Sequence, residues 1–271
     1  MPFLLIIFFP EVNYLREFEK RENLYQRAPK KAIAVLTDSE LGRENSIRRY
    51  GLDESRVFKA SFAPSINVAP SNFVDIKIKY KITGDYIFYP AQFWSHKNHI
   101  YIIEAIKILK DKGFLLIAIF SGSNKGNLDY VLNYAKKNGV DDLVKYIGFA
   151  PNEEIYYLYK QSLALVMPTY FGPTNIPPLE AFSIGTPVFY SNLKGLRDQV
   201  GDAAVLCNLN DPSNLANELL LMKNDCDRRD IFINKGYKRL SELQESSIEK
   251  IIVSIINDFS VKLKCWGNPA N

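Results

Sequence analysis

Short apolar runs alternate with amphipathic stretches along almost the whole chain. Parallel strands have to be joined by crossover segments, which are usually helices. This order therefore predicts a parallel, doubly wound α/β sheet with helices on both faces. Ligands of such sheets bind at the carboxyl ends of the strands. The expected strands are 3–9, 32–38, 56–62, 85–91, 115–121, 143–149, 163–168, 186–191 and 203–207.

Several polar residues have the positions of helix caps. Asn152 is expected to cap the helix that follows it. Asp211 and Pro212 read as the N-cap and first helical residue of another helix. Ser246 and Glu249 have the spacing of a capping box at the start of the last helix.

Composition and local pattern divide the chain into domains. Residues 65–80 contain proline and lack a periodic pattern, which suits a linker. Residues 81–245 supply enough strand–helix units for one complete Rossmann-type domain. Residues 1–64 supply too few elements to cover both faces of such a sheet and are expected to form only part of a second domain.

Charge, hydropathy and cysteine content exclude several classes of protein. Lysine and arginine number 34 against 30 aspartates and glutamates, a scattered excess of +4, so nucleic acid is not an expected partner. No apolar run approaches the roughly 18 to 20 residues that span a bilayer. The segment 3–9 lacks the basic start and cleavage site of a signal peptide. The 3 widely spaced cysteines fit a reducing compartment, so a cytoplasmic protein is expected.

The segment 168–187 carries the most informative chemistry, because it joins a strand end to a helix start. Gly172 allows a positive φ or a close approach to a ligand. Pro177 or Pro178 suits the first helical turn, whose N–H groups and positive dipole end attract anions. Glu180, placed on that turn, could accept two hydroxyls of a ribose. The alternative is a plain strand–loop–helix connection with a capping glutamate.

The segment 89–99 also joins a strand end to a helix start. The ammonium of Lys97 could reach a phosphate held by a helix N-terminus. The alternative is a solvated loop lysine followed by Asn98 as a helix cap. His96 and His99 have H-x-x-H spacing without a nearby carboxylate, so no zinc site is expected. A role for His96 as a proton donor or phosphate ligand stays open.

Two other strand ends could line a nucleotide pocket through backbone groups, one at Gly122 and one at Gly148 and Phe149. The sequence from Asp225 to Asp227 spells the Asp-x-Asp signature of metal-dependent sugar transferases. It falls between two predicted helices and is expected to be a surface turn. No G-x-G-x-x-G follows a predicted strand, which disfavours a dinucleotide-dependent enzyme.

In their order along the chain, these segments resemble the retaining GT-B glycosyltransferases of family four from about residue 30 to 245. The matching stretches are Thr37–Glu40, Ser95–Asn98, Tyr146–Phe149 with Glu153, Glu154, Leu158 and Tyr159, Pro168–Pro187, and Leu196–Ala204. The resemblance implies a GT-B-like fold with one complete Rossmann-type sheet and a partial second half. It implies transfer of a hexose, with retention and without cofactor or metal, from a nucleotide-diphosphate sugar to a glycan or lipid-linked acceptor. It also implies that 246–271 packs back toward the N-terminal piece. Peripheral contact with the inner membrane face is a separate expectation for this cytoplasmic protein.

The same resemblance assigns roles to individual residues. Lys97 would neutralise the diphosphate leaving group and Glu180 would hold the ribose, so these two are the implied catalytic residues. The residues implied for the donor sugar and diphosphate are Gln92, Lys97, Gly172, Thr174, Asn175 and Ile176. Those implied for the nucleoside are Gly122, Gly148, Phe149 and Glu180.

The chain departs from the family pattern in three ways. Gly172 stands where the family has the first glutamate of its Glu-x7-Glu motif, and Gln92 stands where it often has arginine. The glycine-rich start of the family's N-terminal domain has no counterpart, so we expect a fragment or an alternative start. These departures support a second interpretation, a nucleotide-sugar-binding remnant without catalysis. A third is a GT-B remnant without any ligand.

Overall fold

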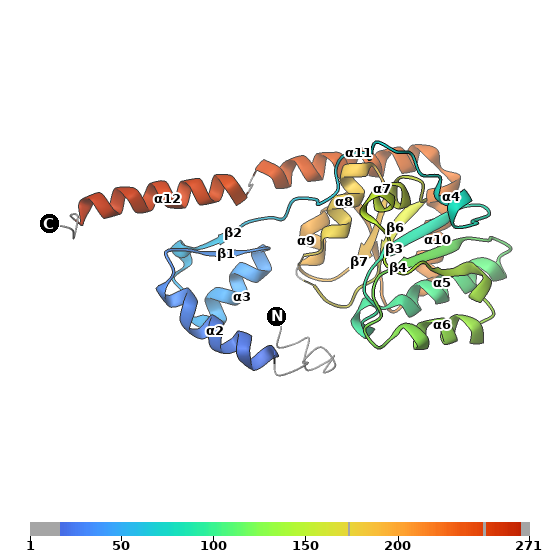
Figure 1. Cartoon of the computed structure of the whole chain (residues 1–271), viewed down its shortest axis with the longest axis horizontal. Helices are drawn as coiled ribbons and strands as arrows, with labels where there is room; N and C mark the ends of the chain where they lie inside the picture. Colours follow the sequence, from blue (N-terminus) through green and yellow to red (C-terminus); the bar gives the residue numbers. More distant parts are fainter. Residues whose placement is uncertain (1–16, 173, 246–247, 267–271) are drawn as a thin grey trace. The chain divides into compact units, whose positions relative to one another are not determined.

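The computed structural model describes residues 17–172, 174–245 and 248–266. The chain divides into two compact units (Figure 1). One contains residues 64–240, and the other contains residues 1–63 and 241–271. Among the described residues, no helix is both long enough and apolar enough to cross a membrane.

The larger unit is built on a parallel sheet that has six strands in the described part of the chain. In spatial order the strands are β5 (Val144–Tyr146), β4 (Ile117–Ser121), β3 (Tyr86–Pro90), β6 (Ala164–Met167), β7 (Val188–Ser191) and β8 (Ala204–Cys207). The chain order reverses between β3 and β6, and doubly wound sheets bind their ligands at such a switch point. The predicted fold class is therefore confirmed.

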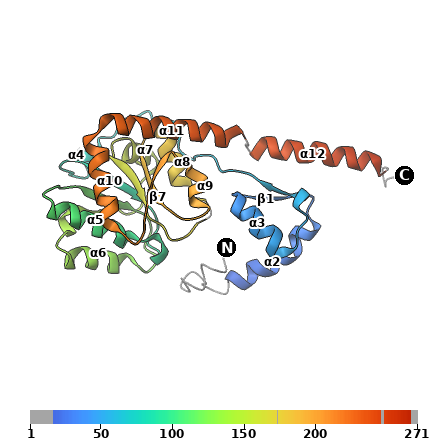
Figure 2. The same ribbon diagram turned by 180° about the vertical axis from the view of Figure 1, so that it is seen from behind.

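Helices cover both faces of this sheet. They are α4 (Ile76–Lys79), α5 (His99–Asp111), α6 (Leu128–Lys137), α7 (Asn152–Lys160), α8 (Ile176–Ile184), α9 (Leu196–Val200), α10 (Pro212–Asn224) and α11 (Cys226–Glu245), with 3-10 turns η4 (Ser95–Lys97) and η5 (Asp141–Leu143). In Figures 1 and 2, α5 and α6 lie on one side of the sheet and α7 and α8 on the other. Because both faces are covered, the central strands are mostly apolar and buried along their length, and do not alternate between buried and exposed residues.

The predicted strands from residue 32 onward are all present, somewhat shorter than expected, whereas the predicted strand 3–9 lies outside the described residues. Asp211 caps α10 as predicted, because its carboxylate accepts the N–H groups of Ser213 and Asn214. The prediction for Asn152 was wrong. Pro151 is the N-cap of α7, and its carbonyl already accepts the N–H of Glu154 at 2.9 Å, so the helix starts one residue earlier. Ser246 lies outside the described residues.

The segment predicted as a linker, 65–80, belongs to the larger unit. Two of its carbonyls accept hydrogen bonds from side chains of α7 and its C-cap. The Tyr157 hydroxyl donates to the Pro70 carbonyl at 3.1 Å, and Gln161 Nε2 donates to the Val74 carbonyl at 2.7 Å. Asp75 then caps the short helix α4 through the N–H of Ile78. The absence of a periodic pattern thus reflects a segment held by side chains rather than by backbone pairing.

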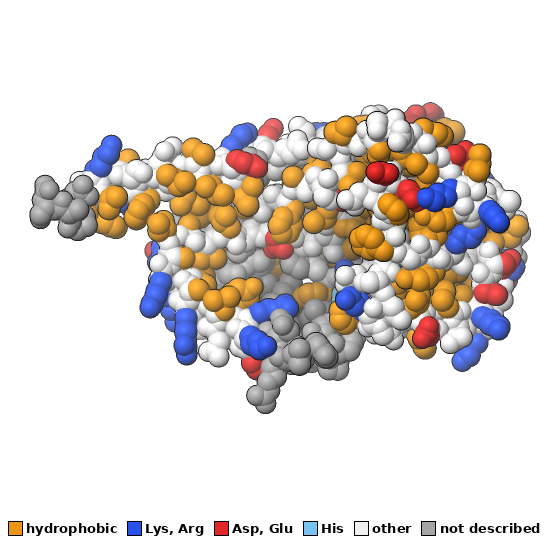
Figure 3. Space-filling view, viewed as in Figure 1, with side chains coloured by type: hydrophobic (Ala, Val, Ile, Leu, Met, Phe, Trp, Pro, Cys, Tyr) orange, Lys and Arg blue, Asp and Glu red, His pale blue; other side chains and the backbone are white. Residues whose placement is uncertain are grey.

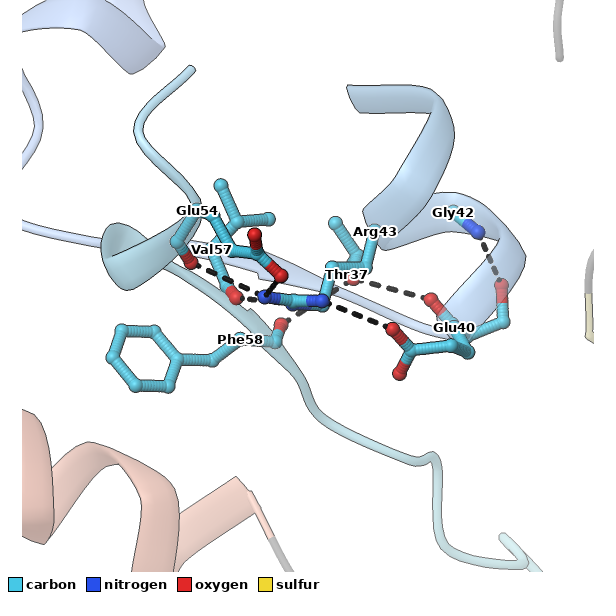
Figure 4. A network of polar contacts seen from close by, with 8 residues as sticks. Thr37, Glu40, Gly42, Arg43, Glu54, Val57 and Phe58 are labelled. Carbon is cyan, nitrogen blue, oxygen red and sulfur yellow. Dashed lines mark hydrogen bonds and ion pairs between the residues drawn. The ribbon is translucent and has the colours of Figure 1, made fainter. Parts of the chain in front are cut away.

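The smaller unit contains a parallel pair of strands, β1 and β2. Its elements are α2 (Glu17–Lys31), β1 (Val35–Thr37), α3 (Glu40–Tyr50), η3 (Glu54–Arg56), β2 (Val57–Lys59) and α12 (Ile248–Cys265). Figure 4 shows Arg43 at the centre of its polar contacts. Its guanidinium donates to the Val57 carbonyl at 2.8 Å and pairs with Glu40 and Glu54, which fastens α3 to β2.

Helix α12 presents hydrophobic side chains at its surface, visible as orange patches at the upper left of Figure 3. Val253, Ile256 and Val261 are 57%, 56% and 62% exposed. Large exposed apolar patches promote association, so we expect this helix to favour association of the protein at high concentration.

Candidate functional site

A cavity of about 660 Å³ opens at the carboxyl ends of the strands, where the chain order reverses. Residues from the ends of β3 and β4, from the loops after β3, β4 and β5, from the first turns of α7 and α8 and from the segment before α4 form its wall. They are Ser65, Ile66, Asn67, Val68, Pro70, Pro90, Ala91, Gln92, Ser121, Gly122, Ser123, Phe149, Ala150, Asn152, Glu153, Ile155, Ile176, Pro177 and Glu180. The fold therefore brings together five of the residues to which the resemblance gives a role in ligand binding: Gln92, Gly122, Phe149, Ile176 and Glu180.

Backbone hydrogen bonds hold the strand-end loops of this cavity together. The N–H of Ala91 donates to the Ser121 carbonyl at 2.8 Å, and the N–H of Gly122 donates to the Gly148 carbonyl at 2.9 Å. Gly122 has φ +150°, and a Cβ there would stand 2.3 Å from the Ala91 carbonyl oxygen, so only glycine fits. Gly148 itself does not line the cavity. Its neighbour Phe149 does, with a side chain that is 81% exposed.

The start of α8 differs from the sequence expectation. Helix α8 begins at Ile176, so Glu180 is its fifth residue and lies in the second turn rather than the first. Pro177 and Pro178 fall in the first turn as predicted, but neither has an N–H group. The helix end therefore offers an anion fewer hydrogen-bond donors than we expected, and the positive end of its dipole carries more of the attraction.

The carboxylate of Glu180 is buried and reaches the cavity. Its Oε2 accepts a hydrogen bond of 2.9 Å from the Tyr159 hydroxyl, and its Oε1 accepts one from the Ser65 hydroxyl. Burial and the adjacent carboxylate raise the pKa of Tyr159 well above its usual value, so this hydroxyl keeps its proton and remains a donor.

Lys97, Asn175 and Gly172 form a second group of predicted residues. Lys97 Nζ donates to Asn175 Oδ1 at 3.4 Å, and Asn175 Nδ2 donates to the Tyr190 hydroxyl at 2.5 Å. A Cβ on Gly172 would lie 2.9 Å from that Nδ2, so the loop passes directly over the Asn175 side chain. Thr174 is half-buried in the same loop. Because Asn175 precedes Ile176, this group adjoins the cavity wall.

The ammonium group of Lys97 is half-buried and lacks an opposite charge among the described residues. Burial lowers the pKa of its ammonium group to about 8, because the charged form is poorly solvated there. Within the described residues, no carboxylate forms an ion pair with it. A bound phosphate would thus supply the opposite charge that Lys97 lacks.

The amide of Gln92 has a defined orientation. The indole N–H of Trp94 donates to Gln92 Oε1 at 2.9 Å. Since an indole nitrogen can only donate, Gln92 must turn its oxygen toward Trp94 and keep its NH₂ group for another acceptor. Gln92 is exposed and lines the cavity, so that NH₂ group can serve an anion there.

The two histidines are neutral packing residues. Burial lowers the pKa of His96 to about 4 and that of His99 to about 3. His99 stacks on Phe93 with ring centroids 4.3 Å apart, and its two buried ring nitrogens have no hydrogen-bond partner among the described residues. In the free chain, His96 is thus mostly uncharged at pH 7. Asn98 lies at the N-cap of α5, as its alternative interpretation predicted, but makes no capping bond.

Asp225 and Asp227 lie where helix α10 ends and helix α11 begins. Asp225 is the C-cap of α10 and accepts the N–H of Arg228 at 2.8 Å, and Asp227 lies in the first turn of α11. Among the described residues, no group of three or more histidines, cysteines, aspartates and glutamates is arranged to hold a metal ion.

Sequence reasoning missed several residues of this site. Tyr159 and Ser65 contact Glu180 from positions 21 and 115 residues away, and Gln199 bonds both backbone groups of Asn175. Such contacts leave no signal in local spacing. Trp94 lies only two residues from Gln92, and a tryptophan beside a polar strand-end residue could have been noticed.

In a comparison with protein families, residues 75–239 match the family described as "Glycosyl transferases group 1". The chain belongs to this family. The matched residues include the six strands of the larger unit and the residues that line the cavity, apart from those in the segment 65–70. Among curated relatives, the O-antigen chain mannosyltransferase B of Escherichia coli is 26% identical over 85% of this chain and 61% of its own length. The O-antigen chain mannosyltransferase RfbU of Salmonella typhimurium is 26% identical over 69% of this chain and 50% of its own.

Solved structures show the same fold at low sequence identity. Anabaena Alr3699/HepE in complex with UDP-glucose has a TM-score of 0.69 and 16% identity, and the match covers 85% of this chain and 64% of that one. A glycosyltransferase from Rickettsia africae has a TM-score of 0.71 and 14% identity, covering 91% and 67%. The larger unit is thus one complete Rossmann-type half of a GT-B fold, and the smaller unit contributes part of a second. The chain spans about half to 61% of the length of the two mannosyltransferases.

Proposed function

We propose that this chain is the donor-binding part of a glycosyltransferase that moves a hexose from a nucleotide-diphosphate sugar to a glycan or lipid-linked acceptor. Because two relatives are named mannosyltransferases, mannose is the first sugar to test. Retention of configuration, metal independence, action in the cytoplasm and peripheral membrane contact stay predictions of the sequence.

One observation carries this proposal. Glu180, Gln92, Gly122 and Phe149 come from four separate segments and meet on one cavity at the switch point of the sheet. A buried carboxylate suits ribose hydroxyls, an exposed aromatic ring suits a base, and a neutral NH₂ group suits a phosphate. The neighbouring Lys97, which has no ion-pair partner among the described residues, suits the second phosphate. These groups match the parts of a nucleoside diphosphate.

The chemistry expected of these residues is stabilisation of the departing diphosphate. Breaking the bond between the sugar and the diphosphate places negative charge on the leaving oxygen. The Lys97 ammonium, the Gln92 amide and the dipole of α8 would stabilise that charge where it develops. In the free chain, Lys97 already donates to Asn175 and Gln92 already accepts from Trp94, so both side chains have a partner before the donor binds.

A binding module without catalysis is the second candidate. Two observations favour it: Gly172 has no side chain to offer the sugar, and Gln92 is uncharged where the family often has arginine. The two candidates differ in whether the bound nucleotide sugar is turned over.

A thermal-shift panel of UDP, GDP, ADP and CDP tests nucleotide binding directly. A ligand at 100 times its dissociation constant stabilises the folded chain by about 2.7 kcal/mol, which should raise Tm by several degrees. We expect one nucleotide to raise Tm equally in the wild type and in Lys107→Ala, and by about half as much in Lys97→Ala, whose affinity should be about tenfold lower. Lys107 is a matched control, because its ammonium also donates to an asparagine Oδ1, that of Asn138, on the exposed side of α5. If none of the four nucleotides raises Tm, the proposal fails.

Nucleotide affinity should fall in alkaline solution. Lys97 has a pKa of about 8 in the free chain, so its charge is lost as pH rises through 8. Above that pH the Lys97 ammonium loses its proton, so affinity should fall toward that of Lys97→Ala, by up to about tenfold in total. Titration calorimetry between pH 7 and pH 9.5 measures this slope. Lys97→Ala should bind weakly with no such slope, and a wild-type affinity independent of pH would contradict the role of Lys97.

A further inference from the structure

Two hydroxyl groups from distant parts of the larger unit hold the carboxylate of Glu180. Tyr159, near the end of α7, donates to Oε2 at 2.9 Å, and Ser65, in the segment before α4, donates to Oε1. Tyr159 is 0% exposed and Glu180 is 8% exposed, so neither side chain has much room to turn. The carboxylate therefore has one defined plane and orientation.

The support of Tyr159 is itself rigid. Its ring packs edge-on against Phe88 in β3, with centroids 5.1 Å apart. Its carbonyl accepts the hydroxyls of Ser162 at 2.7 Å and Thr186 at 3.0 Å. Because the ring and the backbone of Tyr159 are both held in place, its hydroxyl holds Glu180 Oε2 in a defined position.

The support of Ser65 comes from a segment that lies along α7 and α8. The Ser183 hydroxyl donates to the Ile66 carbonyl at 2.8 Å, and the Tyr157 hydroxyl donates to the Pro70 carbonyl at 3.1 Å. Ser183 follows Glu180 by three residues, so one face of α8 carries both the carboxylate and an anchor of this segment. Residues 65–68 and Pro70 line the cavity beside Glu180.

A carboxylate offers about four acceptor positions. Tyr159 and Ser65 occupy two, one on each oxygen, and Glu180 contributes to the cavity wall. The two remaining acceptor positions are thus one on each oxygen. Neighbouring hydroxyls of a ribose have the spacing to reach both oxygens of one carboxylate.

We propose that Tyr159 and Ser65 are positioning residues, which orient Glu180 so that its free acceptor positions receive the 2′ and 3′ hydroxyls of a ribonucleotide. This inference rests on the proposed function, because it requires a nucleoside diphosphate in the cavity. It adds a determinant of selectivity. The hydroxyls of Tyr159 and Ser65 would let the chain distinguish ribonucleotides from deoxynucleotides without contacting the base or the phosphates of the ligand.

The test compares a nucleoside diphosphate with its 2′,3′-dideoxy form. The probe is whichever of UDP, GDP, ADP and CDP raises Tm most. Calorimetry at pH 7.5 gives both dissociation constants, and their ratio is the ribose preference. Losing a hydrogen bond to the carboxylate should lower this preference by about five- to tenfold in Tyr159→Phe and in Ser65→Ala. The dissociation constant of the dideoxy form should change less than about twofold.

Matched controls separate positioning from packing. Tyr86→Phe removes a hydroxyl from another fully buried tyrosine, whose OH donates to the Leu158 carbonyl at 3.0 Å rather than to Glu180. Ser71→Ala changes an exposed serine in the same segment as Ser65. Both controls should keep the wild-type ribose preference.

Three outcomes would overturn the inference, and they differ in what else they exclude. If Tyr159→Phe and Ser65→Ala both keep the wild-type ribose preference, the positioning role is excluded, while the role of Glu180 and the proposed function stand. Equal binding of ribo and dideoxy forms by the wild type contradicts the role of Glu180 as well. No binding of any nucleotide contradicts the proposed function itself. If Tyr159→Phe does not fold, Ser65→Ala decides, because its side chain lies at the surface.

Discussion

Replacing Lys97 by alanine is expected to lower the rate of sugar transfer by about 10²- to 10³-fold, the effect of removing one preorganised donor from a developing negative charge. The structure gives the reason: the ammonium lies half-buried on the loop after β3, adjoins the cavity through Asn175, and has no ion-pair partner among the described residues. The measurement is release of the nucleoside diphosphate from the donor sugar. Affinity for the free diphosphate should fall by about tenfold in parallel.

Lys107→Ala serves as the control for this variant, since it removes a similar hydrogen bond from an exposed site on α5. It should leave both the rate and the affinity unchanged. A Lys97→Ala enzyme that retains most of the wild-type rate would exclude Lys97 from leaving-group stabilisation. Weak diphosphate binding together with no measurable turnover in the wild type would favour the binding module instead.

Replacing Gly122 by alanine is expected to destabilise the chain by about 3–5 kcal/mol. The residue has φ +150°, and its new Cβ would lie 2.3 Å from the Ala91 carbonyl oxygen and 2.6 Å from the carbonyl carbon. Both atoms belong to the backbone, so relief requires the loops after β3 and β4 to separate. Urea unfolding followed by circular dichroism measures the loss, and nucleotide affinity should fall with it because both loops line the cavity.

Gly113→Ala is the matched control for the backbone effect. Gly113 also has a positive φ, +77°, but a Cβ there would meet nothing within 4 Å. Its cost should be that of the backbone conformation alone, about 1–2 kcal/mol. Similar losses in the two variants would show that the close approach of Gly122 to Ala91 adds nothing to stability.

The sequence by itself determined the strand–helix order of the larger unit and the family to which the chain belongs. Strand-length apolar runs and helical spacing are local properties, so the strands from residue 32 onward could be predicted within a few residues. Parallel connections then required a doubly wound sheet, and this placed Gln92, Gly122, Phe149 and Glu180 at strand ends or helix starts. Local pattern was less reliable at Asn152, where the carbonyl of Pro151 starts the helix instead.

Only the tertiary structure decided how these residues are held. The contacts of Glu180 with Tyr159 and Ser65, and of Asn175 with Tyr190 and Gln199, join positions 15 to 115 residues apart. Hydrogen bonds across such separations depend on how elements pack, which no spacing encodes. The pKa of Lys97 follows from burial, and the orientation of the Gln92 amide from one indole N–H. The sequence thus located the residues, while packing fixed their charge and direction.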